Sequence, residues 1–378
     1  MNYIYCIVTT LSFFALQQCF AMENKPNKTP ANIIHTIDTI KKPQSVVTFQ
    51  GDIIAIEGYT ECSIYNIAKK QEICRINNND DIKCIAGHPT KPLLAIISAN
   101  NLQQGYLRIY DVVTGDRIAE LQKNGLRCPL VFNQTNGTLI VRYLWDTLCI
   151  HDCKTLAEIT SSTITTQSVP IIAFSPTTNE CAFCTNRTIT IVDTKNNFTP
   201  TNKEASIAPN STTTLIYNPK GSLICNTYYS KYYIIDPALT PKAYKGNFKA
   251  IAMNPTNLIL AGFSVENACI DYINTQNNGQ ILASTNLKNF NIAHLCHGQY
   301  IQFFSDGKRI IVVGNDKCYV LEVPFDALYQ PETKDKCISA LWALSKCIDN
   351  NNKLLLQDIK NLLIQYLLST CKYSLTNH

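Results

Sequence analysis

Residues 82–121, IKCIAGHPTKPLLAIISANNLQQGYLRIYDVVTGDRIAEL, decide the fold of this chain. Apolar stretches alternate in it with turn residues: Pro89 and Pro92 follow the first stretch, and Thr114-Gly115 follows the third. Short runs rich in β-branched and aromatic residues, bounded by Gly, Pro, Asn or Asp, are typical of strands. The stretch therefore predicts one unit of four strands joined by turns.

The same order of strands and turns recurs along the chain. The other copies are residues 45–76, 129–160, 169–194, 213–236, 249–274 and 299–323. A polar residue closes the third strand of each copy, at Asn66, Asp111, Asp152, Asp193, Asp236, Asn274 and Glu322. Successive closing residues lie 45, 41, 41, 43, 38 and 48 residues apart, which is the period of a four-stranded propeller blade.

Seven such units predict an all-β fold, a seven-bladed β-propeller over residues 33–324. A twisted sheet of four strands buries both of its faces only when it stacks between two neighbours, so the units are expected to close into a ring. Residues 33–40, IIHTIDTI, precede the first copy, whereas the seventh copy ends after its third strand near Pro324. We therefore expect this N-terminal strand to complete the last blade by pairing with residues near 317–323.

This organisation resembles the WD-repeat (WD40-like) family of seven-bladed propellers. The best match is Gly105–Gly115, with Tyr110-Asp111 where the family has Trp-Asp. The pair Gly87-His88 follows the first strand rather than preceding it, and Trp145-Asp146 is out of register, so the family's His/Asp hydrogen-bond network is not transferred. The Asp-x-x-Thr-Gly turn also resembles repeats of quinoprotein-type propellers. The resemblance implies a scaffold that binds proteins.

Four closing residues are expected to shape turns. An Asp side chain accepts hydrogen bonds from backbone N–H groups two or three residues further on, which stabilises a tight turn. We assign this structural role to Asp111, Asp152, Asp193 and Asp236.

The N-terminus predicts export. Residues 2–21 carry no charged side chain, and their apolar stretch ends in Cys19-Phe20-Ala21, which predicts a signal peptide cleaved between Ala21 and Met22. The alternatives are an uncleaved membrane anchor, a lipoprotein site at Cys19, or a buried first element. Residues 22–32 are assigned to a linker. The expected location is periplasmic, extracellular or tethered to a membrane by an uncleaved leader, and cytoplasmic if the leader is not a signal; after cleavage no membrane contact is expected.

The cysteine content argues against export to an oxidising compartment. Of 17 cysteines, Cys6 and Cys19 lie in the leader, which leaves 15 scattered through apolar stretches. A small secreted disulfide scaffold is shorter and denser in cysteine, so we interpret most of them as buried thiols.

In the last 54 residues, 325–378, the spacing of apolar residues differs from that of the propeller strands. Apolar residues recur at helical spacing and predict two amphipathic helices, over about 333–348 and 355–370. The second helix has a weak F-box-like resemblance over Leu355–Leu367, with Leu356 where that motif has Pro. Its stripe of Ile359, Leu362, Leu363, Tyr366 and Leu367 is either a partner-binding surface or packs on the propeller.

Three groups of residues are candidates for a metal or redox site. Cys181 and Cys184 form a lone CxxC inside a strand, where residues three apart face opposite sides. Cys149, His151 and Cys153 share one strand face, but the outer two lie about 13 Å apart at the usual strand rise. His294, Cys296 and His297 show no fourth ligand. Ordinary structural roles are favoured for all three, and we expect no metal site and no cofactor.

Composition and motifs favour a non-enzymatic interaction platform, acting as scaffold or adaptor. With 46% hydrophobic and 16% charged residues the chain is no disordered segment, and a net charge of +5 without a basic block argues against nucleic-acid binding. No nucleophile-elbow, zinc-protease, dinucleotide or P-loop motif occurs. The alternative is an exported propeller enzyme, a metal-dependent hydrolase or quinoprotein-like dehydrogenase, with Asp52, Asp306 and Asp316 as possible ligands at the central channel. Tyr228, Tyr229, Tyr232 and Tyr233 are assigned to blade packing rather than to a binding surface.

Overall fold

The computed structural model describes residues 27–324 with gaps. The gaps are 39–42, 101–103, 134–135, 144–146, 164–170, 186–187, 197–198, 207–211, 228–230, 265, 277–278, 289, 291–300 and 316. The chain divides into two compact units, Met1–Pro324 and Phe325–His378. The predicted leader with its cleavage site and both predicted C-terminal helices lie outside the described residues, as do His294, Cys296 and His297. Among the described residues, no helix is long and apolar enough to cross a membrane.

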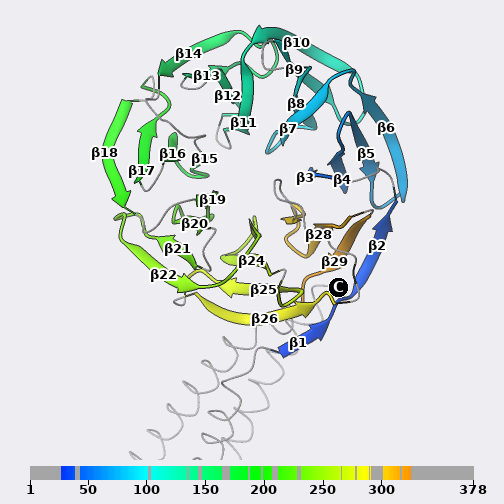
Figure 1. Cartoon of the computed structure of the whole chain (residues 1–378), viewed down its shortest axis with the longest axis vertical. Helices are drawn as coiled ribbons and strands as arrows, with labels where there is room; N and C mark the ends of the chain where they lie inside the picture. The colour runs from blue at the N-terminus through cyan, green and yellow to red at the C-terminus, as the bar shows by residue number, and fades with distance from the viewer. Residues whose placement is uncertain are drawn as a thin grey trace, which may run out of the picture. The chain divides into compact units, whose positions relative to one another are not determined.

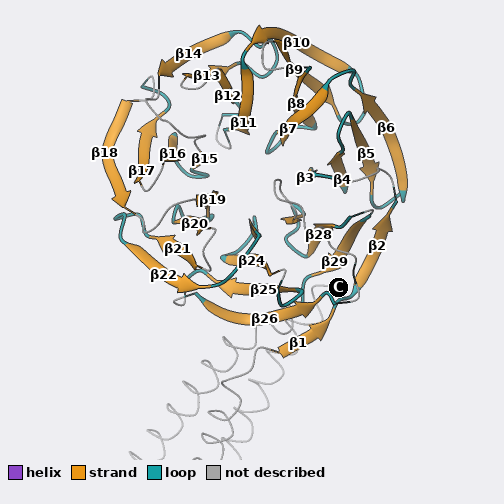
Figure 2. Cartoon of the chain, in the orientation of Figure 1, coloured by secondary structure: helices purple, strands orange, loops and turns teal. Residues whose placement is uncertain are grey.

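The described strands form seven sheets arranged around a central axis (Figures 1 and 2). The first blade holds β3 (Ser45–Thr48), β4 (Ile53–Glu57), β5 (Glu61–Asn66) and β6 (Gln71–Asn77), and the second holds β7 (Asp81–Gly87), β8 (Leu93–Ala99), β9 (Gln104–Asp111) and β10 (Arg117–Asn124). The third holds β11 (Leu126–Phe132), β12 (Leu139–Tyr143), β13 (Thr147–His151) and β14 (Glu158–Thr163). The fourth holds β15 (Ile171–Phe174), β16 (Glu180–Thr185), β17 (Thr188–Asp193) and β18 (Thr199–Ser206), and the fifth holds β19 (Thr212–Tyr217), β20 (Leu223–Thr227), β21 (Lys231–Ile235) and β22 (Pro241–Lys245).

The last two blades include strands from the N-terminus. The sixth holds β23 (Ala250–Met253), β24 (Ile259–Ser264), β25 (Cys269–Asn274) and β26 (Gln280–Asn286), and β1 (Asn27–Pro30) is its fifth strand. The seventh holds β27 (Ile301–Phe303), β28 (Arg309–Val313), β29 (Cys318–Glu322) and β2 (Ile33–Ile37). The predicted seven-bladed all-β propeller is confirmed.

Burial follows the place of each strand in its blade. Every residue of β8 is buried, whereas β10, the outermost strand of the same blade, is largely exposed. A strand covered by neighbouring blades on both faces needs a continuous run of apolar residues. An outermost strand has much of its surface in solvent, so its apolar residues alternate with polar ones or are few. This explains why LLAIISA and RIAELQKN, two strands of the same blade separated by 17 residues, differ so sharply in composition.

The seventh blade receives its outer strand from the N-terminus. β2 pairs antiparallel with β29, and the register joins His35 to Val320, Thr36 to Tyr319 and Ile37 to Cys318. The first and last blades also meet through side chains: Thr48 Oγ1 donates to the Phe303 carbonyl oxygen at 2.8 Å. Segments near residues 35 and 320, far apart in sequence, therefore lie in adjacent strands.

The linker assigned to residues 22–32 needs a correction. Asn27–Pro30 is strand β1 and pairs in parallel with Ala283–Asn286 of β26. The sequence NKTP carries no apolar alternation, so no pattern predicted a strand there. β1 covers the outer edge of β26, whose backbone groups would otherwise lack partners in the sheet, and a segment that pairs through its backbone needs no apolar side chains to do so.

Candidate functional site

The turn between the third and fourth strands of a blade is held by the predicted acidic residue. Asp111 Oδ1 accepts from the Val113 N–H at 2.7 Å, and Asp152 Oδ1 accepts from the Thr155 N–H at 2.8 Å. Asp193 accepts from the Lys195 N–H at 2.9 Å, and Asp236 accepts from the Thr240 N–H at 2.9 Å. All four side chains therefore bridge to backbone within their own turns.

One position of this turn requires a left-handed backbone. Gly115 has a φ of 81°, and its N–H donates to the Asp111 carbonyl oxygen at 2.8 Å. A Cβ on Gly115 would approach the Cys74 sulfur to 2.7 Å. Both the backbone conformation and the lack of space for a side chain therefore favour glycine at this position. In the third blade Leu156 occupies the equivalent position with a φ of 56°, a conformation that costs a branched residue free energy.

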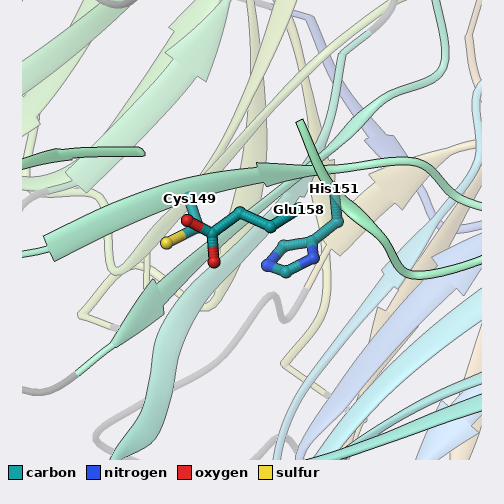
Figure 3. A group of neighbouring side chains, drawn as sticks. All are labelled: Cys149, His151 and Glu158. Atoms are coloured by element: carbon teal, nitrogen blue, oxygen red, sulfur yellow. The ribbon is translucent and has the colours of Figure 1, made fainter. Parts of the chain in front are cut away.

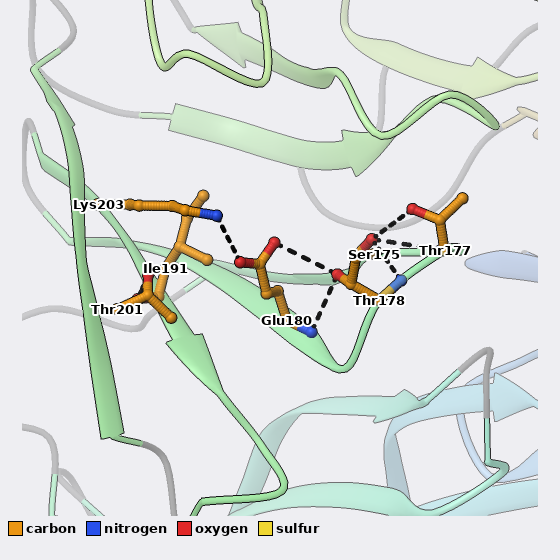
Figure 4. Close-up of polar contacts among 7 residues, drawn as sticks. All are labelled: Ser175, Thr177, Thr178, Glu180, Ile191, Thr201 and Lys203. Atoms are coloured by element: carbon orange, nitrogen blue, oxygen red, sulfur yellow. Dashed lines mark hydrogen bonds and ion pairs between the residues drawn. The ribbon is translucent and has the colours of Figure 1, made fainter.

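The turn between the first and second strands repeats the same device with other residues. In the fourth blade Ser175 Oγ accepts from the Thr177 and Thr178 N–H groups, while Glu180 pairs with Lys203 of the outer strand at 2.6 Å (Figure 4). Asn218 and Asn254 cap the corresponding turns of the fifth and sixth blades.

His88 fills this capping position in the second blade. Its Nδ1 accepts from the Thr90 N–H at 3.2 Å and the Lys91 N–H at 3.1 Å, and the ring is 5% exposed beside Phe132. An imidazole accepts at Nδ1 only when that nitrogen carries no proton. Burial, with help from the Lys91 charge, lowers the pKa of His88 and favours this neutral form.

In the first six blades these two sets of turns lie at the same end, because consecutive strands run antiparallel. We call this end the turn face. It contains a cavity of about 340 Å³ between the first two blades, lined by Gln50, Gly51, Ile53, His88, Pro89, Thr90, Lys91, Pro92 and Val113. Val113 is 55% exposed at its edge. The turn face thus combines fixed backbone with an apolar hollow.

Two of the carboxylates considered as channel ligands are engaged elsewhere. Arg309 binds both Asp306 Oδ2, at 2.7 Å, and Asp52 Oδ1, and its guanidinium lies over the Phe304 ring at 4.7 Å. The two acids therefore meet across the first and seventh blades in an ion pair with one arginine. Asp316 lies outside the described residues.

A different group of ligand atoms gathers in the third blade. Cys149 Sγ, a ring nitrogen of His151 and a carboxylate oxygen of Glu158 all lie within 4.8 Å of one another, and Figure 3 shows the three side chains converging. Sequence reasoning paired Cys149 and His151 with Cys153 and missed Glu158. Finding Glu158 requires the register between β13 and β14, and no sequence motif specifies that register. Cys153 is buried but is not part of this group.

The remaining candidates have structural surroundings. Cys181 packs in the core between the third and fourth blades and Cys184 in the core between the fourth and fifth, so the two thiols face opposite sides. Tyr232 and Tyr233 likewise enter different cores, and Tyr232 stacks on Tyr244 with ring centroids 5.3 Å apart. Tyr228 and Tyr229 lie outside the described residues.

Glu57 is a buried acid that the sequence did not single out. It ends β4, is 4% exposed, and its Oε2 is hydrogen-bonded to Ser45 Oγ on β3. Burial raises the pKa of Glu57 from 4.5 to about 7, and the bond from Ser45 opposes this rise only in part.

The comparisons with known proteins identify the fold. The sequence matches no family model and no curated protein at a significant level. Among solved structures it is similar to the Cps50 (Swd1) β-propeller domain of Myceliophteria thermophila, with a TM-score of 0.63 at 13% identity over 78% of this chain and 100% of that one. It is also similar to U3-55K, with a TM-score of 0.64 at 8% identity over 79% of this chain and 100% of that one. Both are WD40 β-propellers, and the F-box-like resemblance of the C-terminal segment finds no support.

Proposed function

We propose that this chain is a non-enzymatic platform for protein–protein interaction, a scaffold or adaptor that binds its partner through the turn face. The observation that carries the proposal is the capping of both sets of turns by side chains, at His88, Ser175, Asn218 and Asn254 and at the four aspartates. Ordering a flexible loop on binding costs free energy, and turns already held in place avoid that cost.

The composition of the turn face suggests the kind of contact. Its turns carry Asn, Thr, Lys and Asp, and the apolar hollow beside Val113 is small. Interfaces of this type are partly hydrated, with one or two anchoring side chains in a polar surround. Likeness to two WD40 propellers supports the proposal at the level of the fold.

The proposal is tested by recovering bound proteins with matched surface variants. Val113→Asp places a charge at the rim of the hollow, and Ile159→Asp places the same charge at another exposed residue, 57% exposed, on the outer strand β14. We expect Val113→Asp to deplete specific partners at least tenfold while Ile159→Asp keeps them. Equal recovery with wild type and both variants would refute the use of this face.

The C-terminal unit and the leader add two further proposals. Cutting the chain after Pro331 removes the segment predicted to form a helix with Ile359, Leu362, Leu363, Tyr366 and Leu367. We propose that this segment contributes to partner binding, and an unchanged partner set after the cut contradicts that role. We also propose export directed by residues 2–21 with cleavage after Ala21. Amino-terminal sequencing of the mature protein, starting at Met22 if cleavage occurs, tests it.

A further inference from the structure

The group in the third blade is built by three separate local features. Cys149 and His151 are two residues apart on β13 and therefore face the same side of the blade. Cys149 is 2% exposed and packs among apolar residues of the second and third blades, so this side faces the second blade. His151 is 1% exposed on the same side.

A bulge brings Glu158 to the same side. Ile150 pairs with Thr160, but His151 pairs with Glu158, so Ile159 is the extra residue of β14 and is 57% exposed. Residues directly opposite in adjacent strands project from the same face of a sheet. Without the bulge His151 would face Ile159, and the carboxylate would project away from the cysteine.

The orientation of His151 is fixed by a backbone group. Its Nδ1 lies 2.9 Å from the Leu156 carbonyl oxygen, which only accepts hydrogen bonds, so Nδ1 carries the proton. In this tautomer Nε2 is the unprotonated ring nitrogen, the form that binds a metal ion. A backbone carbonyl holding one ring nitrogen while the other binds a metal is the usual environment of a ligating histidine. Leu156 delivers this carbonyl from the strained left-handed position of its turn.

The propeller fold does not itself require histidine here. The residue that precedes the closing residue of the third strand is Tyr65, Tyr110, Val192, Ile235, Ile273 or Leu321 in the other blades. An ordinary packing position therefore holds a nitrogen ligand in this blade, beside a thiol and a carboxylate.

We propose that Cys149, His151 and Glu158 form a binding site for a transition-metal cation, with Zn²⁺ as the expected ion. A thiolate, a neutral imidazole and a carboxylate are the three ligand types that zinc takes, and a site with three protein ligands leaves a fourth position for water. In tetrahedral coordination the ligand atoms lie about 3.5 Å apart, given metal–ligand distances of about 2.0–2.3 Å. The present separations are all within 4.8 Å, so they come close to this value before any ion is bound.

Charge and protons balance at the site. Glu158 Oε2 pairs with Lys123 of β10 at 3.2 Å, and a carboxylate has a second oxygen that binds the ion while this pair persists. Cys149 is 2% exposed among apolar neighbours, and a thiol in such surroundings keeps its proton when no metal is bound. Binding replaces the S–H bond with an S–Zn bond and releases one proton to solvent, with no change of oxidation state.

The test uses Co²⁺ as a spectroscopic substitute for Zn²⁺ on the full-length protein after treatment with a chelator. Wild type is expected to bind one Co²⁺ per chain at this site, with a thiolate-to-cobalt charge-transfer band and tetrahedral d–d bands that Zn²⁺ abolishes. Cys149→Ser should lose the charge-transfer band. Cys153→Ser, a buried neighbour outside the group, should keep it.

Two more variants make the test independent of misfolding and of other cysteines. Glu158→Gln changes an exposed side chain on the outer strand and should weaken Co²⁺ binding at least about tenfold while circular dichroism stays unchanged. Cys296→Ser removes the cysteine of the other His/Cys cluster and should bind like wild type. Absence of a thiolate band in wild type, wild-type affinity in Glu158→Gln, or loss of the band in Cys296→Ser with retention in Cys149→Ser would each overturn the proposal.

Discussion

Replacing Glu57 by Gln is expected to stabilise the propeller at alkaline pH and to leave it almost unchanged in acid. Glu57 is 4% exposed, and its pKa is raised from 4.5 to about 7, chiefly because the charged form loses its hydration. The folded protein therefore binds a proton that the unfolded chain has already released. A neutral amide keeps the hydrogen bond to Ser45 without carrying a charge into the core.

The sign and size follow from proton linkage. Between pH 4.5 and about 7 the folded state holds more protons than the unfolded state, so this group lowers the unfolding free energy as pH rises. The loss is complete above the folded pKa and amounts to about 3 kcal/mol, since one pKa unit corresponds to about 1.4 kcal/mol. The free energy of unfolding of Glu57→Gln minus that of wild type should therefore increase by roughly 2.5 kcal/mol between about pH 5 and about pH 8.5.

Urea unfolding of wild type and Glu57→Gln at these two pH values measures the effect. The difference between the two proteins is the relevant quantity, because buried histidines change stability in the opposite direction over the same pH range. Glu204→Gln, at an exposed position, serves as the control and should show no pH-dependent difference. If Glu57→Gln and wild type differ by the same amount at both pH values, Glu57 is ionised in the folded protein and the reasoning fails.

Three further predictions concern the turns and the N-terminal strand. His88→Asn should keep the cap, as Asn does at Asn218, and should reduce the loss of stability as pH falls below about 6.5, because the unfolded chain there binds a proton that the neutral His88 imidazole excludes in the folded state. Thermal melting at two pH values checks this, and a pH profile identical to that of wild type contradicts it. Asp152→Ala should lower the free energy of unfolding by about 1 kcal/mol, and Asp152→Asn should lower it less, because Asp152 Oδ1 accepts hydrogen bonds from the Lys154 and Thr155 N–H groups. Equal losses for the two variants in urea unfolding would contradict this capping role. Ile37 on β2 is 2% exposed, so Ile37→Ala should lower the free energy of unfolding by about 2–4 kcal/mol, whereas Ile34→Ala, at 42% exposure, should change it little. Equal losses for the two variants in urea unfolding would mean that β2 does not pair with β29 in solution.

The candidate sites show where sequence reasoning stops. Asp52 and Asp306 are candidate metal ligands by sequence because both are acidic, yet both pair with Arg309. Arg309 lies three residues after Asp306 but 257 residues after Asp52, so only the tertiary structure brings Asp52 to it. Glu158 was not considered because its position opposite His151 depends on one bulged residue in β14. Strand β1 was not predicted because NKTP pairs through its backbone, and composition does not report such pairing.

By itself the sequence determined the number of blades, their period and the strands within each. These are local properties: a four-stranded meander is a contiguous segment, and its buried middle strands must be apolar whatever lies beyond them. Only the tertiary structure decided which side chains meet between strands and between blades, such as Cys149 with Glu158 or Asp52 with Arg309. A shift of one residue in register turns a side chain to the opposite face, and no periodicity in the sequence records such a shift.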